Sequence, residues 1–188
     1  MTGLLGGTFN PPHNGHLALA RGARDHFDLD DLVVLVAERP GHKRAGLDAD
    51  TRLKLARAAF PEYRVEADPY ERTVDMLRAQ HWSEPLFLLG ADQFADFLTW
   101  KDPEGVLALA RIGVATRPGF PLERLDPVLQ QLSRPDRVEL FEIEPISISS
   151  REVRKRVGGG ESIDGLVPPA VAELIESLGL YQDGSNGS

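Results

Sequence analysis

The sequence predicts a doubly wound α/β fold built on a mostly parallel sheet. Short apolar runs of strand type alternate along the chain with segments whose apolar residues recur at helical spacing. Runs such as Asp31–Val36 and Leu86–Leu89 are apolar almost throughout, which is typical of strands buried on both faces of a parallel sheet. Alternation of such strands with helices favours an α/β architecture. The chain lacks Gly-x-Gly-x-x-Gly, so it does not carry the usual fingerprint of dinucleotide-dependent dehydrogenases.

Strands and helices are expected to alternate up to about residue 143, and two further helices follow. The expected strands are Thr2–Leu5, Asp31–Val36, Tyr63–Glu66, Leu86–Leu89, Ile112–Thr116 and Val138–Ile143. The expected helices are Leu17–Phe27, Asp50–Phe60, Thr73–His81, Asp102–Ala110, Leu125–Leu132, a helix from Ser149 to the glycines at 158–160, and Pro169–Leu178.

Capping signals mark several of these helices. The run Asp-Pro-Glu at 102–104 combines an N-cap residue, a proline at the first helical position and an acid in the first turn. Ser149 and Glu152 have the spacing of a capping box, and Thr73 is the expected N-cap of its helix. Gly179 is the expected stop of the last helix.

The composition is that of an ordinary globular protein, with 41% hydrophobic and 27% charged residues among 188. This length favours one domain, which we expect to span residues 1–181, followed by a polar tail at 182–188 that we expect to be disordered. The net charge of −8 argues against a nucleic-acid partner, although a local pocket can still bind phosphate. The absence of cysteine excludes a disulfide framework and a thiol nucleophile.

No apolar stretch approaches the length of a membrane span, so we expect no membrane partner. The first residues lack a basic region followed by a long apolar run, which is the pattern of a signal peptide. We therefore expect a cytoplasmic protein, and the sequence is compatible with a homo-oligomer.

The chain is organised around the loop between the first strand and the first helix, Gly-Gly-Thr-Phe-Asn-Pro-Pro-His-Asn-Gly-His at 6–16. In open parallel sheets, ligands bind outside the carboxyl ends of the strands, where this loop lies. Gly6 and Gly7 allow a tight turn and a close approach of the backbone to a ligand. His13 and His16 are three residues apart, so they fall on one side of the first helical turn, whose N–H groups favour an anion.

Two simpler interpretations of the histidines are a helix cap and a metal site. Zinc is disfavoured because the chain has no cysteine and no His-Glu-x-x-His. A histidine pair beside a helix N-terminus can instead hold a polyphosphate and stabilise the charge that develops during transfer. The sequence therefore predicts a phosphate site at this loop, with no protein ligands to a metal.

Two further segments are expected to serve phosphates and a ribose. Ser149 and Ser150 begin a helix that also carries Arg154, so hydroxyls, backbone N–H groups and a guanidinium can meet phosphate oxygens. Taken alone, this segment would be a well-capped surface helix. Gly90-Ala91-Asp92 follows a buried strand, and Asp92 can accept from ribose hydroxyls or support a metal-bound water. It can also cap the next helix, and these roles are compatible.

Two other segments contain side chains that can contact a flat ring or an anion. Trp100 follows Thr99, and an indole can stack on a flat heterocycle. Trp100 could equally be a half-buried core residue. His42-Lys43 lies in a basic loop after the second strand, where phosphate binding and simple solvation are about equally expected.

Together these segments resemble the bacterial nicotinate-nucleotide adenylyltransferases of the HxGH nucleotidyltransferase superfamily, over nearly the whole chain. The resemblance implies a Rossmann-like nucleotidyltransferase fold. It also implies adenylyl transfer from ATP to nicotinate mononucleotide, giving deamido-NAD and pyrophosphate in NAD biosynthesis. Mg²⁺ is implied as a cofactor that binds through the ATP phosphates, and no covalent intermediate is needed.

The resemblance assigns the site in three groups of residues. It assigns catalysis to His13, His16 and Arg154. It assigns ATP binding to Gly6, Gly7, Thr8, Phe9, His13, Gly15, His16, Gly90, Asp92, Ile148, Ser149, Ser150 and Arg154. It assigns substrate binding to Asn10, Lys43, Arg72, Thr73, Asp75 and Trp100.

The chain departs from the family pattern at several of these positions. Asn10 stands where the family usually has aspartate, which removes a negative charge beside the phosphates. Gly41 replaces a proline, Met76 replaces a threonine, and Arg151 replaces a threonine, which adds a cation and removes a hydroxyl. Arg72 replaces a tyrosine and brings a cation toward the expected pyridine site, where it would favour a carboxylate over a neutral amide.

Other functions stay open at this point. Another nucleotidyltransferase of the superfamily could act on nicotinamide mononucleotide, pantetheine phosphate or another phosphomonoester, although Thr73, Asp75 and Trp100 favour a pyridine substrate. A ligase related to aminoacyl-tRNA synthetases would carry Lys-Met-Ser-Lys-Ser, which is absent. A non-catalytic nucleotide sensor is a remote alternative, and the intact His13 and His16 argue against it.

Overall fold

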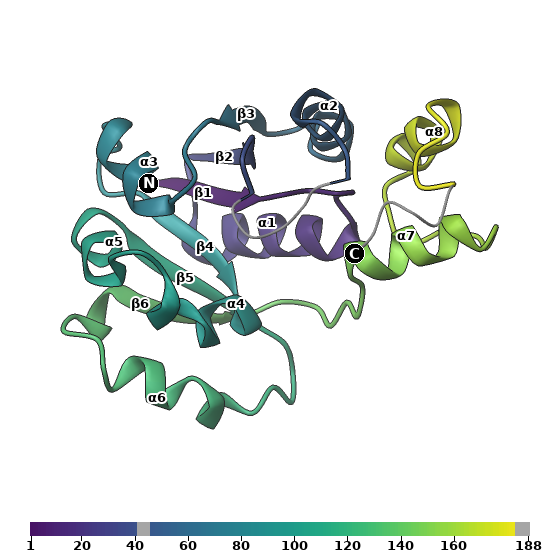
Figure 1. The fold of residues 1–188 in the computed structure, drawn as a ribbon. Helices are drawn as coiled ribbons and strands as arrows, with labels where there is room; N and C mark the ends of the chain where they lie inside the picture. Colours follow the sequence, from purple (N-terminus) through teal and green to yellow (C-terminus); the bar gives the residue numbers. More distant parts are fainter. Residues whose placement is uncertain (41–45, 183–188) are drawn as a thin grey trace.

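The computed structural model describes residues 1–40 and 46–182. Within them the chain forms a six-stranded sheet whose strands are all parallel, in the order β3-β2-β1-β4-β5-β6 (Figure 1). The strands are β1 (Thr2–Gly7), β2 (Asp31–Ala37), β3 (Arg64–Asp68), β4 (Leu86–Gly90), β5 (Arg111–Thr116) and β6 (Val138–Glu142). The helices are α1 (Asn14–Phe27), α2 (Ala49–Ala59), α3 (Thr73–Ala79), α4 (Ala91–Ala95), α5 (Pro103–Leu109), α6 (Asp126–Leu129), α7 (Ser150–Gly158) and α8 (Pro169–Ser177). In these ranges, no helix is both long and apolar enough to cross a membrane.

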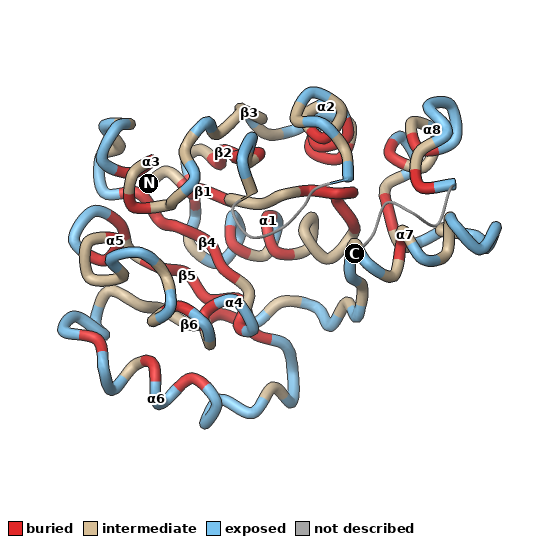
Figure 2. Tube along the Cα trace, viewed as in Figure 1, coloured by how far each residue is buried: buried red, intermediate tan, exposed pale blue. Residues whose placement is uncertain are grey.

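Two layers of helices cover the sheet. Neighbouring residues of a strand point to opposite faces, so Leu4 and Leu5 of β1 enter different cores. The helices α1, α2, α7 and α8 pack on the face that carries Leu5, and α3 to α6 pack on the face that carries Leu4 (Figure 1). Buried residues concentrate in the central strands and on the inner sides of the helices (Figure 2). The continuous apolar runs thus serve two cores, and the predicted doubly wound α/β class is confirmed.

The six predicted strands are present in the described residues, with ends that shift by one or two positions. The expected N-cap role of Thr73 is wrong, because Arg72 occupies the N-cap position and Thr73 is already helical. This helix ends at Ala79 rather than His81. The helix α4 was not predicted, since a single turn directly after β4 is too short for a helical pattern to be recognised.

The helix expected at 125–132 is also shorter than predicted. Only Asp126–Leu129 is α-helical, and the N–H of Gln131 bonds the carbonyl of Val128, three residues back, so the chain tightens into a turn. The predictions for Lys43 and for the tail from 183 onward concern positions outside the described residues.

The N-cap predictions for Asp102 and Ser149 are confirmed, but the predicted capping box at Ser149 is only half formed. The Asp102 carboxylate accepts from the N–H of Gly105 at 2.9 Å. The Ser149 hydroxyl accepts from the N–H of Glu152 at 3.2 Å, while the Glu152 carboxylate pairs with Arg156 instead of completing a capping box.

Arg52 of α2 is buried to 1% exposure although it carries a charge. Its Nη1 donates to the carbonyls of Thr8 (3.0 Å) and Ala37 (2.6 Å), and its Nη2 donates to the carbonyl of Glu38 (3.2 Å). Its Nε donates to the carbonyl of Leu47 at 3.3 Å. Burial lowers the pKa of this guanidinium, but an arginine stays protonated at neutral pH. One side chain therefore joins the ends of β1 and β2 to the start of α2.

Replacing Arg52 with Met should lower the free energy of unfolding by about 3 kcal/mol or more, because carbonyls bonded to a charged donor lose their partner while staying buried. Urea unfolding at neutral pH measures the difference. Arg57→Met on the same helix is the matched control, since Arg57 is exposed and its loss should change stability by less than about 0.5 kcal/mol. Equal effects of the two substitutions would contradict a structural role for Arg52.

Candidate functional site

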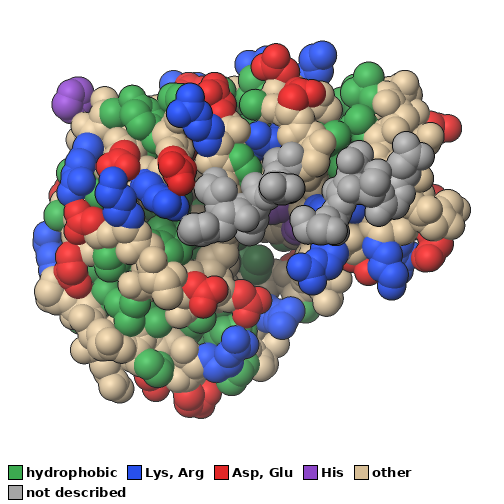
Figure 3. Space-filling view, viewed as in Figure 1, with side chains coloured by type: hydrophobic (Ala, Val, Ile, Leu, Met, Phe, Trp, Pro, Cys, Tyr) green, Lys and Arg blue, Asp and Glu red, His purple; other side chains and the backbone are tan. Residues whose placement is uncertain are grey.

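The strand order reverses between β1 and β4, which lie side by side at the centre of the sheet. β1 leads into α1 on one face, and β4 leads into α4 on the other. The two connections therefore diverge and leave a crevice at the carboxyl ends of these strands, which is where open α/β sheets bind ligands. The space-filling view is hollowed near the centre of this face, with a histidine side chain visible inside (Figure 3).

The loop from Thr8 to His13 crosses the base of this crevice in a constrained conformation. Phe9 has a φ of 49°, a left-handed value that costs energy for a residue with a side chain, and its ring is buried. Arg154 Nη1 donates to the carbonyl of Asn10 at 2.7 Å. The Ser150 hydroxyl donates to the carbonyl of Pro11 at 2.8 Å. The loop is thus held from outside, by the first turns of α7 and by Arg52.

The loop delivers the two predicted histidines to one place. His13 is the N-cap of α1, and its backbone N–H donates to Nδ1 of His16 at 3.1 Å. The two rings lie 3.7 Å apart between centroids, at an interplanar angle of 32°. Because Nδ1 of His16 accepts, the neutral ring of His16 carries its proton on Nε2.

His13 differs from its neighbour in being almost fully buried, at 9% exposure. Burial lowers the pKa of His13 from 6.5 to about 4, so this ring is neutral at physiological pH. Its Nδ1 is buried and has no hydrogen-bond partner among the described residues. A buried ring nitrogen in that state is available to a ligand group that reaches it.

A pocket that we call the histidine pocket opens beside this pair. Its volume of about 330 Å³ lies in the range of small-molecule sites, ~300–1,000 Å³. It is formed by the start of α1, the start of α4, the end of β5 and the segment after β6. The lining residues are His13, Gly15, His16, Leu19, Gly90, Ala91, Asp92, Gln93, Ala115, Thr116, Arg117, Phe120, Ile143, Glu144, Ile146 and Ile148.

Six predicted ATP-binding residues line the histidine pocket: His13, Gly15, His16, Gly90, Asp92 and Ile148. Thr116, Arg117 and Phe120 also line it and were not predicted. A signal for them existed, because Thr116 and Arg117 come at the carboxyl end of a buried strand just as Gly90 does.

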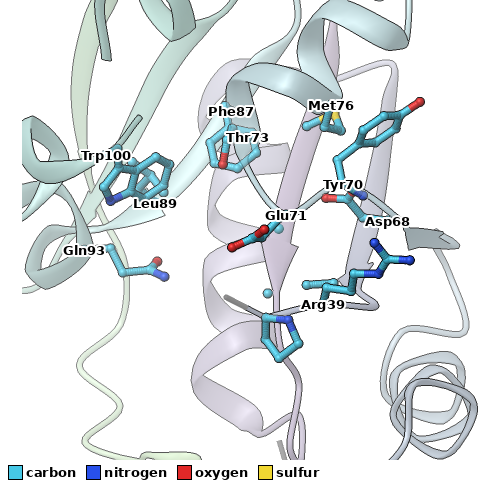
Figure 4. Close-up of a pocket in the computed structure, with 14 residues that line it drawn as sticks. Arg39, Asp68, Tyr70, Glu71, Thr73, Met76, Phe87, Leu89, Gln93 and Trp100 are labelled. Atoms are coloured by element: carbon cyan, nitrogen blue, oxygen red, sulfur yellow. The ribbon is translucent and has the colours of Figure 1, made fainter. Parts of the chain in front are cut away.

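A second pocket, which we call the Trp100 pocket, lies on the other side of the crevice (Figure 4). Its volume of about 120 Å³ is close to the ~150 Å³ of a cavity that holds one benzene ring. The lining residues are Gly6, Gly7, Ala37, Arg39, Pro40, Asp68, Tyr70, Glu71, Thr73, Met76, Phe87, Leu89, Gln93 and Trp100. The indole of Trp100 packs against Phe97 and edge-on against Phe87, with centroids 5.4 and 6.3 Å away.

The structure brings only some of the predicted substrate residues to the Trp100 pocket. Thr73 and Trp100 line it, together with Gly6 and Gly7 from the ATP-binding prediction. Asp75 does not line it, and its carboxylate pairs with Lys101 at 3.0 Å.

Arg72 also lies outside the lining of the Trp100 pocket, and its Nη2 pairs with the carboxylate of Glu71 at 3.1 Å. The guanidinium that does line the pocket belongs to Arg39, opposite Trp100 in the close-up (Figure 4). Asp68 lines it as well, and burial raises the pKa of that carboxyl group despite a bond from the N–H of Tyr70. Sequence reasoning did not single out Asp68 or Glu71, since nothing in their local pattern distinguishes them from surface acids.

Gln93 of α4 lines both pockets. Its side-chain oxygen accepts from the N–H of Gly90 at 3.4 Å, and the close-up places the amide on the Trp100 side of the crevice (Figure 4). Two molecules that occupied the two pockets would therefore meet beside Gln93 and the histidine pair.

The remaining predicted residues serve the loop or the start of α7. The Ser149 hydroxyl is engaged as the N-cap, and the Ser150 hydroxyl is bonded to the loop. Arg151 is exposed, whereas Arg154 points to the loop and has a buried Nε with no partner in the described ranges. In those ranges no group of three or more His, Cys, Asp or Glu residues could hold a metal ion.

Comparisons with known proteins agree on one family. The cytidylyltransferase-like family model matches residues 4–156. The chain is 37% identical to a "Probable nicotinate-nucleotide adenylyltransferase" of Moorella thermoacetica, over 98% of this chain and 93% of that protein. It is 38% identical to a protein of the same description from Thermus thermophilus, over 96% of this chain and 98% of that one.

Among solved structures, the fold matches Plasmodium falciparum nicotinic acid mononucleotide adenylyltransferase complexed with NaAD, with a TM-score of 0.81. The match covers 96% of this chain and 97% of that one, at 18% sequence identity. This similarity supports the Rossmann-like fold.

Replacing His13 with Gln should remove an acid-dependent loss of stability. The pKa of His13 is about 4 in the folded protein, below its ordinary value of 6.5. At a pH between these two values the unfolded chain therefore binds a proton at His13 more readily than the folded protein does. Stability therefore falls as the pH drops through this window, by about 2 kcal/mol between pH 7 and pH 5. Urea unfolding of both proteins at the two pH values measures the difference.

His81→Gln is the matched control, because His81 is exposed and the wild-type loss should persist without it. Equal losses in the wild type and in His13→Gln would show that His13 does not titrate as a buried group.

Proposed function

The chain belongs to the nicotinate-nucleotide adenylyltransferase family of cytidylyltransferase-like proteins, and from this premise we propose that residues 1–181 form one domain that transfers the adenylyl group of ATP to nicotinate mononucleotide. The products are deamido-NAD and pyrophosphate. One observation carries the proposal: two pockets meet at Gln93, beside a histidine pair at the N-terminus of α1. A site that joins two ligands through phosphate needs this arrangement.

The histidine pocket receives the adenylate part of ATP. Its size suits a nucleoside, and Phe120 and Ile146 offer apolar surface while Arg117 and Asp92 offer polar groups at the rim. The Trp100 pocket receives the pyridine ring, against which the indole can stack. With the two molecules placed in this way, the phosphates of ATP and the phosphate of the mononucleotide would both lie in the crevice between the pockets.

In this geometry a phosphate oxygen of the mononucleotide attacks the α-phosphorus of ATP in line. The new P–O bond forms as the bond to pyrophosphate breaks, and the leaving group takes the electron pair. Negative charge grows on the α-phosphate and on the leaving group, where the Nε2–H of His16 and the N-terminus of α1 can stabilise it. His13, neutral and buried, keeps the pair in place and offers its ring nitrogen.

Magnesium would accompany the ATP substrate and would neutralise negative charge on its phosphates. The described residues offer no cluster of acidic or histidine side chains that would hold the ion by themselves. Lys43, outside the described residues, and the start of α7 with Ser149, Ser150 and Arg154 would serve the phosphates. The reaction depends on ATP, which supports a location in the cytoplasm. The proposal involves no nucleic-acid or membrane partner.

A second acceptor, nicotinamide mononucleotide, is favoured by one observation. Asp68 and Glu71 bring two carboxyl groups to the Trp100 pocket, which disfavours a third carboxylate. Two features counter this: Arg72 pairs with Glu71, and Arg39 lines the pocket. We therefore keep the acid as the first candidate.

His16→Ala should lower kcat by about 10²-fold or more, the scale for losing a preorganised group that stabilises transition-state charge. The fold should survive, because His16 is only partly buried. Pyrophosphate release with ATP and nicotinate mononucleotide measures the effect, and His81→Ala, outside both pockets, is the control. Near-normal turnover in His16→Ala would remove this residue from the mechanism.

The substrate proposal is tested by kcat/KM for each mononucleotide with saturating magnesium–ATP. We expect nicotinate mononucleotide to be preferred by about 10–100-fold. A donor that bonds a carboxylate oxygen of the acid would meet the NH₂ of the amide instead, and neither donor would then have an acceptor. Pantetheine phosphate belongs in the same panel.

Equal use of the two mononucleotides, or preference for the amide, would exclude the acid-specific proposal and leave adenylyl transfer intact. Preference for pantetheine phosphate would exclude the pyridine assignment. Absence of pyrophosphate release with every acceptor would favour a non-catalytic nucleotide sensor.

A further inference from the structure

The chain returns to the site after its last helix. α8 ends in a Schellman turn: the N–H of Leu180 bonds the carbonyl of Ile175 at 2.9 Å, and the N–H of Gly179 bonds that of Glu176 at 3.1 Å. Gly179 has a φ of 60°, which glycine adopts without strain and which confirms its predicted role as the stop. The turn directs the chain back so that Tyr181 lies inward, where it is 3% exposed.

The hydroxyl of Tyr181 donates to Oδ1 of Asn10 at 2.7 Å, a fully buried hydrogen bond between residues 171 positions apart. Asn10 is itself 7% exposed. Its backbone carbonyl accepts from Arg154, so both its side chain and its backbone are fixed by residues that follow the sheet.

We propose that Tyr181 is a positioning residue for adenylyl transfer: by holding Asn10 it fixes the loop that delivers His13 and His16. This inference rests on the proposed function for its kinetic consequence. Tyr181 lines neither the histidine pocket nor the Trp100 pocket, so it acts through Asn10 and not on a ligand.

The loop needs such an anchor because its conformation is strained. Phe9, directly before Asn10, holds a left-handed φ of 49°. A strained residue relaxes unless its neighbours are fixed, and His13 lies only three positions beyond Asn10. Small shifts at Asn10 would therefore move the histidine pair against the phosphates, and displacements of this kind lower kcat steeply.

The phenol suits this role because it remains a donor over the whole working range of pH. Burial raises the pKa of Tyr181, although the charges of Arg154 and Arg52 act in the opposite direction. The hydrogen bond therefore does not open by ionisation, and the side-chain oxygen of Asn10 stays directed at the core.

The test compares Tyr181→Phe with Tyr63→Phe. Tyr63 supplies the matched control because its hydroxyl is buried with no hydrogen-bond partner among the described residues. In Tyr181→Phe we expect kcat to fall about tenfold while both KM values stay within about twofold, since the linings of the two pockets are intact. In Tyr63→Phe we expect unchanged kcat and KM.

A second variant separates positioning from general destabilisation. Asn10→Leu removes the acceptor with little change in shape, so adding Tyr181→Phe to it should lower kcat no further. If the two effects multiply, the residues act independently and the proposal fails. Unchanged kcat in Tyr181→Phe would overturn it as well.

Hydrogen exchange of the ligand-free protein gives a readout that does not depend on the reaction. Peptides covering 8–13 should exchange several-fold faster in Tyr181→Phe than in the wild type or Tyr63→Phe, while peptides from β1 and β4 keep their rates. If the wild type proves inactive with every mononucleotide, the proposed function fails and exchange alone decides whether Tyr181 fixes the loop. Unchanged exchange at 8–13 would refute the anchor.

Discussion

The loop between β1 and α1 carries buried backbone that cannot pair within any helix or strand, and meeting this requirement organises much of the molecule. Buried carbonyls without donors are costly. Here the donors are side chains: Arg52 for Thr8, Arg154 for Asn10, and the hydroxyl of Ser150 for the next carbonyl. Arginine suits this task, because its fork offers several N–H groups in fixed directions and stays charged when buried. The loop is thus bonded by side chains of α2 and of α7, from two distant parts of the chain.

The parallel sheet creates the crevice, and the loop after β1 brings the histidine pair to it. At the switch point, α1 and α4 leave β1 and β4 on opposite faces, so a crevice forms without any special sequence. The two pockets differ in their linings: the start of α1 and the end of β5 line the histidine pocket, and the ends of β2 and β3 with the residues after them line the Trp100 pocket. Their junction at Gln93 follows from the position of α4 directly after β4.

The sequence was sufficient for the fold class and for the placement of His13 and His16 side by side at the start of the first helix. Continuous apolar strands and capping signals such as Asp102 and Gly179 are local effects, so they can be read from neighbouring residues. The burial of Arg52 and of Tyr181 could not, because each depends on carbonyl or amide groups distant in the sequence. The guanidinium that lines the Trp100 pocket belongs to Arg39, from the loop after β2, whereas Arg72 lies outside that lining and pairs with Glu71.

The described residues after β6 add no strand to the sheet, yet they hold the loop after β1 and the start of α1. α7 bonds the loop through Ser150 and Arg154, and the turn before α8 holds the start of α1, since Asn14 donates to the carbonyls of Gly165 and Leu166 at 2.8 and 2.9 Å. The same helices pack Val153 and Ile175 into the core that contains Leu5. Perturbing the C-terminal helices should therefore affect both the position of the histidine pair and the stability of the fold.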